Sequence, residues 1–189
     1  MLRALALLFL VFNLSGCVIG AFVVGAAAGG AIIYDKRSVK EQLSDRKISE
    51  LSEQRIDKDK ELAEKSHISI ATFHRVVLMV GQVQTPELKD RAYEIVSGVP
   101  GVKRIFNELV ISDKINYLLR TDDHWITTKA KTQMLATSGL HSSDIKVVTE
   151  DGVVYLMGHV THRQGDLATQ VAREVPGVVK VVRVFEYEN

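Results

Sequence analysis

The sequence predicts an α+β protein built from two tandem αββαβ sandwiches, each with a three-stranded mixed sheet and helices on one face. The main observation is an internal repeat: "VVLMVGQVQTPELKDRAYEIVSGVPGVKRIFNELVI" begins at Val76, and "VVYLMGHVTHRQGDLATQVAREVPGVVKVVRVFEYE" begins at Val153. Both copies carry a glycine late in the first apolar run, Gly81 and Gly158, and a later Pro-Gly-Val. Self-similarity at one spacing indicates a duplicated structural unit.

The second copy shows the order of the elements most clearly. The turn Glu150-Asp151-Gly152 predicts a hairpin, because Asp-Gly tolerates the positive backbone angles of tight turns. A helix joins the last two strands, so these strands are expected to run parallel. The expected elements are a helix, two strands, a helix and a strand over residues 125–136, 146–149, 153–160, 164–174 and 179–187.

The first copy fits the same order less regularly. Strands over 67–72 and 76–83 are expected to pair across Phe73-His74-Arg75, which contains no glycine. The leading helix is expected from the charge-dense segment 35–65, because apolar residues recur there at near-helical spacing. These residues are Ile48, Leu51, Ile56 and Leu62.

The N-terminal residues have the three regions of a secretory signal, with a positive start at Arg3, an apolar block and then small residues. The leader ends in Leu14-Ser15-Gly16-Cys17, which resembles the lipobox of bacterial lipoproteins. The resemblance implies that Cys17 carries acyl chains such as palmitate and becomes the N-terminus. By the same resemblance to lipoprotein sorting, Val18 directly after the cysteine lacks the acidic inner-membrane retention signal, so the outer membrane is the expected destination. A cysteine buried in a transmembrane helix is the alternative.

The expected domain boundaries follow from the leader and the repeat. The segment after Cys17 contains Gly25-x-x-x-Gly29, a spacing that lets membrane helices approach closely, although a tether of small residues is the favoured interpretation. The expected divisions are a signal peptide, a tether, a first domain and a second domain over residues 1–16, 17–44, 45–113 and 121–189.

Composition narrows the classes of function. The chain has 24 Lys and Arg against 23 Asp and Glu, a formal net charge of +1, and removal of Arg3 with the leader brings this to zero. Nucleic-acid binding is not expected, since such domains are normally clearly basic. The chain's only cysteine is Cys17, so no disulfide can form within the chain, and stability is expected to come from packing.

No pattern of residues predicts an enzyme, a cofactor or a metal centre. The sequence has no Gly-rich phosphate loop, no Gly-x-Ser-x-Gly and no His-Glu-x-x-His. His159-x-x-His162 is the nearest approach to a metal motif. No cysteine or acidic ligand cluster accompanies it, so these histidines are interpreted as exposed turn residues.

The glycine near the end of the second strand, the "VPGV" before the last strand and the αββαβ order resemble the BON domain of bacterial envelope proteins. A lipobox followed by two such domains resembles the dual-BON outer-membrane lipoproteins of the DolP family. The resemblance covers roughly residues 1–17 and 45–189 and is strongest in "DDHWITTKAKTQML" and "VVYLMGHVT". In that family, the helix with the matching tryptophan is implicated in binding anionic phospholipid.

The helix that begins near Trp125 has two distinct sides when its residues are spaced by about 100°. Ile126, Ala130 and Met134 form a stripe that is expected to face the sheet. The side of the helix that points away from the sheet is the outward side, and Lys131 flanks it. The residues of that outward side are Trp125, Thr128, Lys129, Thr132 and Leu135.

An exposed tryptophan beside a leucine and lysines suits contact with a membrane surface that carries anionic, phosphatidylglycerol-like phospholipids. Geometry alone equally allows Trp125 to pack against a neighbouring loop or domain. With the family resemblance, the sequence predicts a non-enzymatic outer-membrane lipoprotein that binds phospholipid through this helix, faces the periplasm and supports envelope integrity. The alternative is a protein-interaction or chaperone-like module for outer-membrane assembly proteins.

Overall fold

A computed structural model describes residues 38–112 and 120–188 of the chain. The expectations for the leader, for Cys17 and for the small-residue segment 18–33 lie outside the described residues. None of the helices within the described ranges has both the length and the apolar composition that a bilayer span requires.

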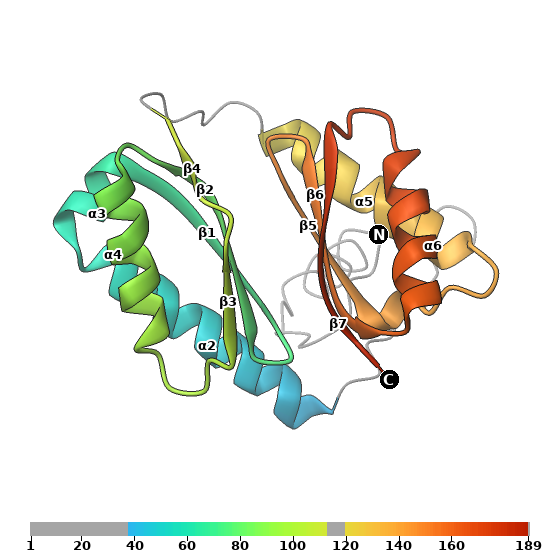
Figure 1. The fold of residues 1–189 in the computed structure, drawn as a ribbon, viewed down its shortest axis with the longest axis horizontal. Helices are drawn as coiled ribbons and strands as arrows, with labels where there is room; N and C mark the ends of the chain where they lie inside the picture. The colour runs from blue at the N-terminus through green and yellow to red at the C-terminus, as the bar shows by residue number, and fades with distance from the viewer. Residues whose placement is uncertain (1–37, 113–119, 189) are drawn as a thin grey trace, which may run out of the picture. The chain divides into compact units, whose positions relative to one another are not determined.

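The second domain has the αββαβ order that the sequence predicts. Its central strand β6 pairs antiparallel with β5 and parallel with β7, and α5 and α6 cover one face of the sheet (Figure 1). The predicted three-stranded mixed sheet is therefore confirmed for this copy. The elements are α5 (Arg120–Ala136), a 3-10 turn (Ser142–Asp144), β5 (Ile145–Glu150), β6 (Val153–Val160), α6 (His162–Arg173) and β7 (Lys180–Tyr187).

The first domain repeats this arrangement with one difference, because its last strand is divided into two pieces that both pair parallel with β2. Its sheet therefore has four strands, not the expected three. The division occurs where Leu109 turns into the core and its carbonyl accepts a hydrogen bond from Lys89 Nζ at 2.6 Å. The elements are α2 (Val39–Asp57), α3 (Lys60–Lys65), β1 (Ser66–Phe73), β2 (Val76–Val83), α4 (Pro86–Ser97), β3 (Arg104–Asn107) and β4 (Val110–Ile111).

The charge-dense segment forms two helices rather than one. Ser38 and Glu41 make a capping box at the start of α2, so the helix begins before the expected start of the domain at residue 45. Asp59 caps α3 by accepting hydrogen bonds from the amides of Glu61 and Leu62. The chain thus turns after Asp57, which allows Leu62 to enter the same core as the buried residues of α2.

Each leading helix is tied to a hairpin turn by a buried aspartate. Asp45 on α2 accepts hydrogen bonds from the amides of His74 and Arg75, at 3.0 and 2.8 Å. Asp123 on α5 accepts hydrogen bonds from the amides of Asp151 and Gly152, both at 2.8 Å. Asp45 is only 4% exposed and Asp123 only 8%. Because water has little access there, these carboxylates serve as the hydrogen-bond partners of the turn amides.

The glycine shared by the two copies is required by close approach of the backbone in or directly before the neighbouring strand. A Cβ added to Gly81 would lie 2.0 Å from the carbonyl oxygen of His67, and one added to Gly158 would lie 2.6 Å from that of Asp144. Any side chain at either position would therefore push apart the first two strands of its sheet.

The sheet faces that carry no helices pack against each other. We call this packed region the inter-sheet core, and polar contacts flank it: Lys146 Nζ donates to the carbonyl of Thr72 at 3.0 Å, and Lys103 Nζ lies 3.1 Å from the Glu186 carboxylate. Each sheet is therefore covered on both faces. The buried residues of the inter-sheet core are Ala71, Phe73, Val76, Leu78, Val80, Tyr155, Met157 and Val184.

Replacement of the turn-binding aspartate is expected to destabilise the fold strongly. Asp123→Ala leaves two buried amides unpaired and should lower the free energy of unfolding in urea by about 2 to 4 kcal/mol. Asp122→Ala, at the exposed neighbouring position, is the matched control and should stay within about 0.5 kcal/mol of the parent. Equal unfolding midpoints for the two variants would contradict this account of the turn.

The inter-sheet core should also give the protein a characteristic response to alkaline pH. Burial, reinforced by nearby carboxylates, raises the pKa of Tyr155 to about 12. The unfolded chain ionises this phenol at its ordinary pKa of about 10, so the stability that the neutral phenol contributes is complete below pH 10 and is lost between about pH 10 and 12.

Urea unfolding of the parent and of Tyr155→Phe at several pH values measures this loss. The parent should lose about 2 to 3 kcal/mol more than the variant over that interval, since one pKa unit corresponds to about 1.4 kcal/mol. Parallel profiles would show that Tyr155 ionises as readily in the folded protein as in the unfolded chain.

Candidate functional site

Helix α5 places its residues as the sequence periodicity predicts. Ile126, Ala130 and Met134 are buried in the core of the second domain. The opposite side is open, with Trp125 at 51% and Leu135 at 39% exposure. We call this side the outward face of α5; its residues are Trp125, Thr128, Lys129, Thr132 and Leu135, all of them exposed.

The two threonines of the outward face do not present free hydroxyl donors. Thr128 Oγ1 donates to the carbonyl of His124 at 2.9 Å, and Thr132 Oγ1 donates to the carbonyl of Thr128 at 2.8 Å. The ammonium of Lys129 is the cation of this face.

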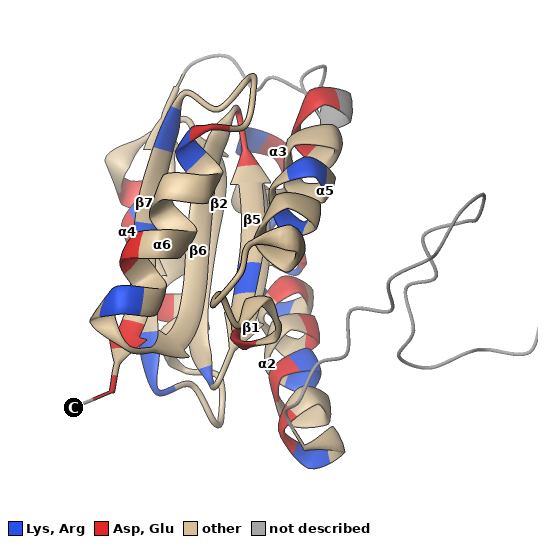
Figure 2. Ribbon diagram, turned by 90° about the vertical axis from the view of Figure 1, so that its right-hand side faces the viewer, with Lys and Arg blue, Asp and Glu red and all other residues tan. Residues whose placement is uncertain are grey.

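Lys131 differs from Lys129 in its surroundings. Its side chain is half-buried, and burial lowers the pKa of its ammonium group. It therefore lies at the edge of the outward face rather than on it, and its charge is less available to a ligand than that of Lys129. Figure 2 shows the basic residues of α5 after the acidic residues of its first turn.

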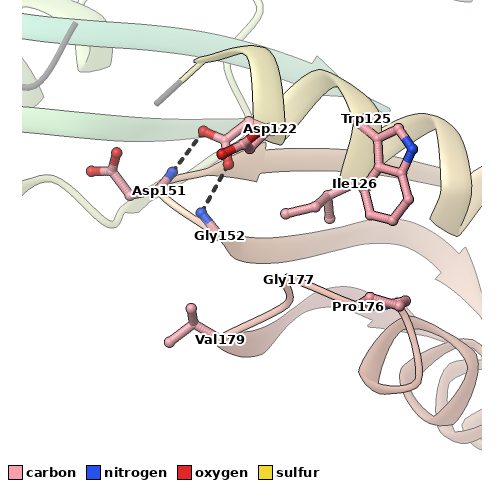
Figure 3. A pocket seen from close by; sticks show the side chains of 9 residues that line it. Asp122, Trp125, Ile126, Asp151, Gly152, Pro176, Gly177 and Val179 are labelled. Carbon is pink, nitrogen blue, oxygen red and sulfur yellow. Dashed lines mark hydrogen bonds between the residues drawn. The ribbon is translucent and has the colours of Figure 1, made fainter. Parts of the chain in front are cut away.

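A cleft of about 420 Å³ lies beside Trp125 (Figure 3). The indole forms one side, and the loop between α6 and β7 lies across from it. The hydrogen bonds from the β5–β6 turn to α5 define one end. The cleft is lined by Asp122, Asp123, Trp125, Ile126, Asp151, Gly152, Pro176, Gly177 and Val179.

Sequence reasoning found Trp125 but not the cleft beside it. Periodicity assigns residues to a face of their own helix, whereas this cleft also needs Gly152 and Val179 from two separate loops. The repeat carried a usable signal, because the residues aligned with Gly152 and Val179 in the first copy are Arg75 and Lys103.

The two histidines of the His159-x-x-His162 motif do not converge on a common point. His159 faces Glu188 at 3.4 Å, whereas the ring of His162 stacks on Tyr187 with centroids 4.0 Å apart. Within residues 38–112 and 120–188, no three histidine, cysteine or acidic side chains form a group that could hold a metal ion.

The geometry defines a protein made of two packed αββαβ domains, with an exposed aromatic and cationic helix face on the second. The BON domain family model matches residues 44–113 and 122–189. The chain therefore belongs to the BON-domain proteins, and specifically to the dual-domain DolP family.

Three relatives show how far the similarity extends. The outer membrane lipoprotein DolP of Haemophilus influenzae is 33% identical over 92% of this chain and 90% of its own length. The 21 kDa hemolysin of Actinobacillus pleuropneumoniae is 36% identical over 81% of this chain and 79% of its own length. The osmotically-inducible protein Y of Escherichia coli is 31% identical over 65% of this chain and 63% of its own length.

Because Trp125 is half-exposed, its replacement should cost little stability. Trp125→Glu should lower the free energy of unfolding by less than about 1 kcal/mol, whereas Met134→Glu on the buried side should prevent folding or cost more than about 3 kcal/mol. Urea unfolding followed by circular dichroism checks both. A large loss for Trp125→Glu would show that the indole is a structural part of the domain.

Proposed function

We propose that this protein is a lipid-anchored outer-membrane lipoprotein that faces the periplasm, and that its second domain binds anionic phospholipid through the outward face of α5. Cys17 carries the acyl chains after removal of the leader. The protein supports envelope integrity and does not act as an enzyme. The relationship to outer membrane lipoprotein DolP supports the location.

The observation that carries the lipid proposal is the composition of the outward face. An exposed indole suits the headgroup level of a bilayer, an aliphatic side chain can enter the acyl region, and an ammonium group attracts phosphate. Trp125, Leu135 and Lys129 supply these three groups on one side of one helix.

The two attachments have different roles. Acyl chains on Cys17 hold the protein on the membrane, since each buried methylene contributes about 0.8 kcal/mol. The outward face then selects anionic headgroups within that membrane. The chain as a whole is nearly neutral, so this selection depends on local charge and should weaken as salt rises.

Flotation of the chain lacking residues 1–17 with phosphatidylglycerol vesicles tests this proposal. The parent should float at low salt and much less at high salt. Trp125→Glu and Lys129→Glu should each reduce the bound fraction at least about fivefold, because one removes the interfacial ring and the other reverses the cation.

Lys47→Glu is the matched control. Lys47 is exposed on α2 at the position that corresponds to Trp125, so the substitution makes the same charge change as Lys129→Glu in the other copy. It should leave flotation within about twofold of the parent. If Trp125→Glu floats as well as the parent, the lipid site is misplaced. Capture of one protein by a crosslinker at position 129, without vesicle binding, would favour a protein partner.

A further inference from the structure

The cleft beside Trp125 suits a different part of a lipid from the outward face. Its sides are largely apolar, formed by the indole of Trp125, Ile126, Pro176 and Val179. Val179 is 80% exposed, the most exposed of the large apolar residues in the described chain. The cleft has a volume of about 420 Å³, which lies within the range of about 300 to 1,000 Å³ that small-ligand sites occupy.

The first domain provides an internal comparison, because matching contacts align the two copies residue by residue. The amide of Val179 donates to the carbonyl of Gly152, and the amide of Lys103 donates to that of Arg75, both at 2.9 Å. Ser49 bonds Thr72 on β1, as Thr127 bonds Thr149 on β5. These pairs fix the positions that correspond to the cleft.

The corresponding place in the first domain is bridged by a side chain. Arg75 Nε donates to the carbonyl of Gly101 at 2.7 Å, so the arginine side chain reaches across to the loop that faces it. Its counterpart in the second domain is Gly152, which has no side chain. A Cβ there would lie 3.0 Å from Val179 Cγ2 and 3.1 Å from the carbonyl oxygen of Gly177. Any side chain at position 152 would therefore crowd Val179 and the loop that lines the cleft.

The other two differences change the chemistry of the same place. Lys47 and Lys103 of the first domain correspond to Trp125 and Val179 of the second. With Arg75, the first domain thus has three cations at these positions. The second domain has a tryptophan, a glycine and a valine in their place. These substitutions make the place in the second domain both open and apolar.

The charges at the cleft decide which part of a lipid can enter. Asp122 and Asp151 lie at one end, and the Asp123 carboxylate is held by the turn amides. An anionic headgroup would be repelled there, whereas an acyl chain would meet apolar sides. Lys129, one turn beyond Trp125 on α5, is placed to hold the headgroup outside.

We propose that this cleft binds one acyl chain of an anionic phospholipid, with the headgroup directed toward Lys129. Trp125 then contacts the lipid with both its exposed edge and its cleft side. This inference rests on the proposed function, because it assigns the acyl part of the same ligand. It adds that the protein binds a single lipid molecule, and not only the surface of a bilayer.

The test uses the chain without residues 1–17, which keeps the complete unit of residues 35–189. The probe is dihexanoyl phosphatidylglycerol below its micelle concentration, compared with its deacylated headgroup. The monomeric lipid should shift the emission of Trp125, the chain's only tryptophan, and the amide resonances of Gly152 and Val179. The deacylated headgroup should shift neither.

Gly152→Gln should raise the dissociation constant of the monomeric lipid at least about tenfold, since each methylene that can no longer be buried is worth about fourfold in affinity. The matched control is Gly139→Gln, because Gly139 also has a positive φ, +79°, but a Cβ there would meet no atom within 4 Å. It carries a similar backbone strain without filling the cleft and should bind as the parent does.

Val179→Ser provides a second variant that changes only an exposed side chain, and it should weaken binding of the monomeric lipid about threefold or more. Equal binding by Gly152→Gln and Gly139→Gln would overturn the proposal. The proposal would also be overturned if an apolar peptide shifted the amide resonances of Gly152 and Val179 and the lipid did not. The cleft would then serve a protein partner.

The failure of this inference can be told from the failure of the proposed function. If the parent floats with phosphatidylglycerol vesicles but does not bind the monomeric lipid, the cleft is not an acyl site and the outward face still binds membranes. If the parent does neither, both proposals are wrong.

Discussion

The hydrogen bonds between a buried aspartate and a hairpin turn position the start of the helix on which the candidate site depends. Asp123 holds the amides of Asp151 and Gly152, which fixes the start of α5 against the β5–β6 turn. Trp125 is two residues further along the same helix, so its side of the cleft and the turn are set by one carboxylate. A hydrogen bond to a charged group is worth about 1.5 to 3 kcal/mol, enough for two of them to hold this geometry firmly.

The packing of the two sheets explains why the candidate site lies on a helix. A sheet with helices on one face often offers the other face to a ligand or to solvent. Here the second faces cover each other in the inter-sheet core, and β2 is buried along its whole length. Within residues 38–112 and 120–188, the outer sides of the helices, the loops and the edge strands are the parts that remain accessible. An exposed tryptophan on α5 is therefore placed where the fold still allows a contact.

The sequence was sufficient for features that depend on local pattern. The repeat predicted two domains of one type, the Asp-Gly turn predicted the β5–β6 hairpin, and the 100° spacing predicted which side of α5 is buried. Features that depend on contacts between distant segments could not be predicted in this way. The turn at His74 and Arg75 adopts positive φ angles of 48° and 65° without a glycine, because Asp45 holds its amides from another element.

The inter-sheet core shows the same limit in a different form. The apolar run of β2 indicates a strand that is buried on both faces, but it does not indicate what covers the second face. The answer is the other copy of the domain, through residues such as Leu78 and Met157. Likewise, the division of the last strand of the first copy depends on where Leu109 finds space in the core, which no spacing in the sequence records.

The contacts between the domains involve one of the residues that differ between the two copies at the cleft position. In the first domain, Lys103 lies 3.1 Å and Arg104 lies 3.9 Å from the Glu186 carboxylate of β7. Lys103, the counterpart of Val179, and its neighbour Arg104 therefore both contribute to the contact between the two domains. In the second domain the corresponding residue is Val179, whose apolar side chain is 80% exposed. Its side chain lines the cleft together with Gly152, and it is exposed to whatever enters there.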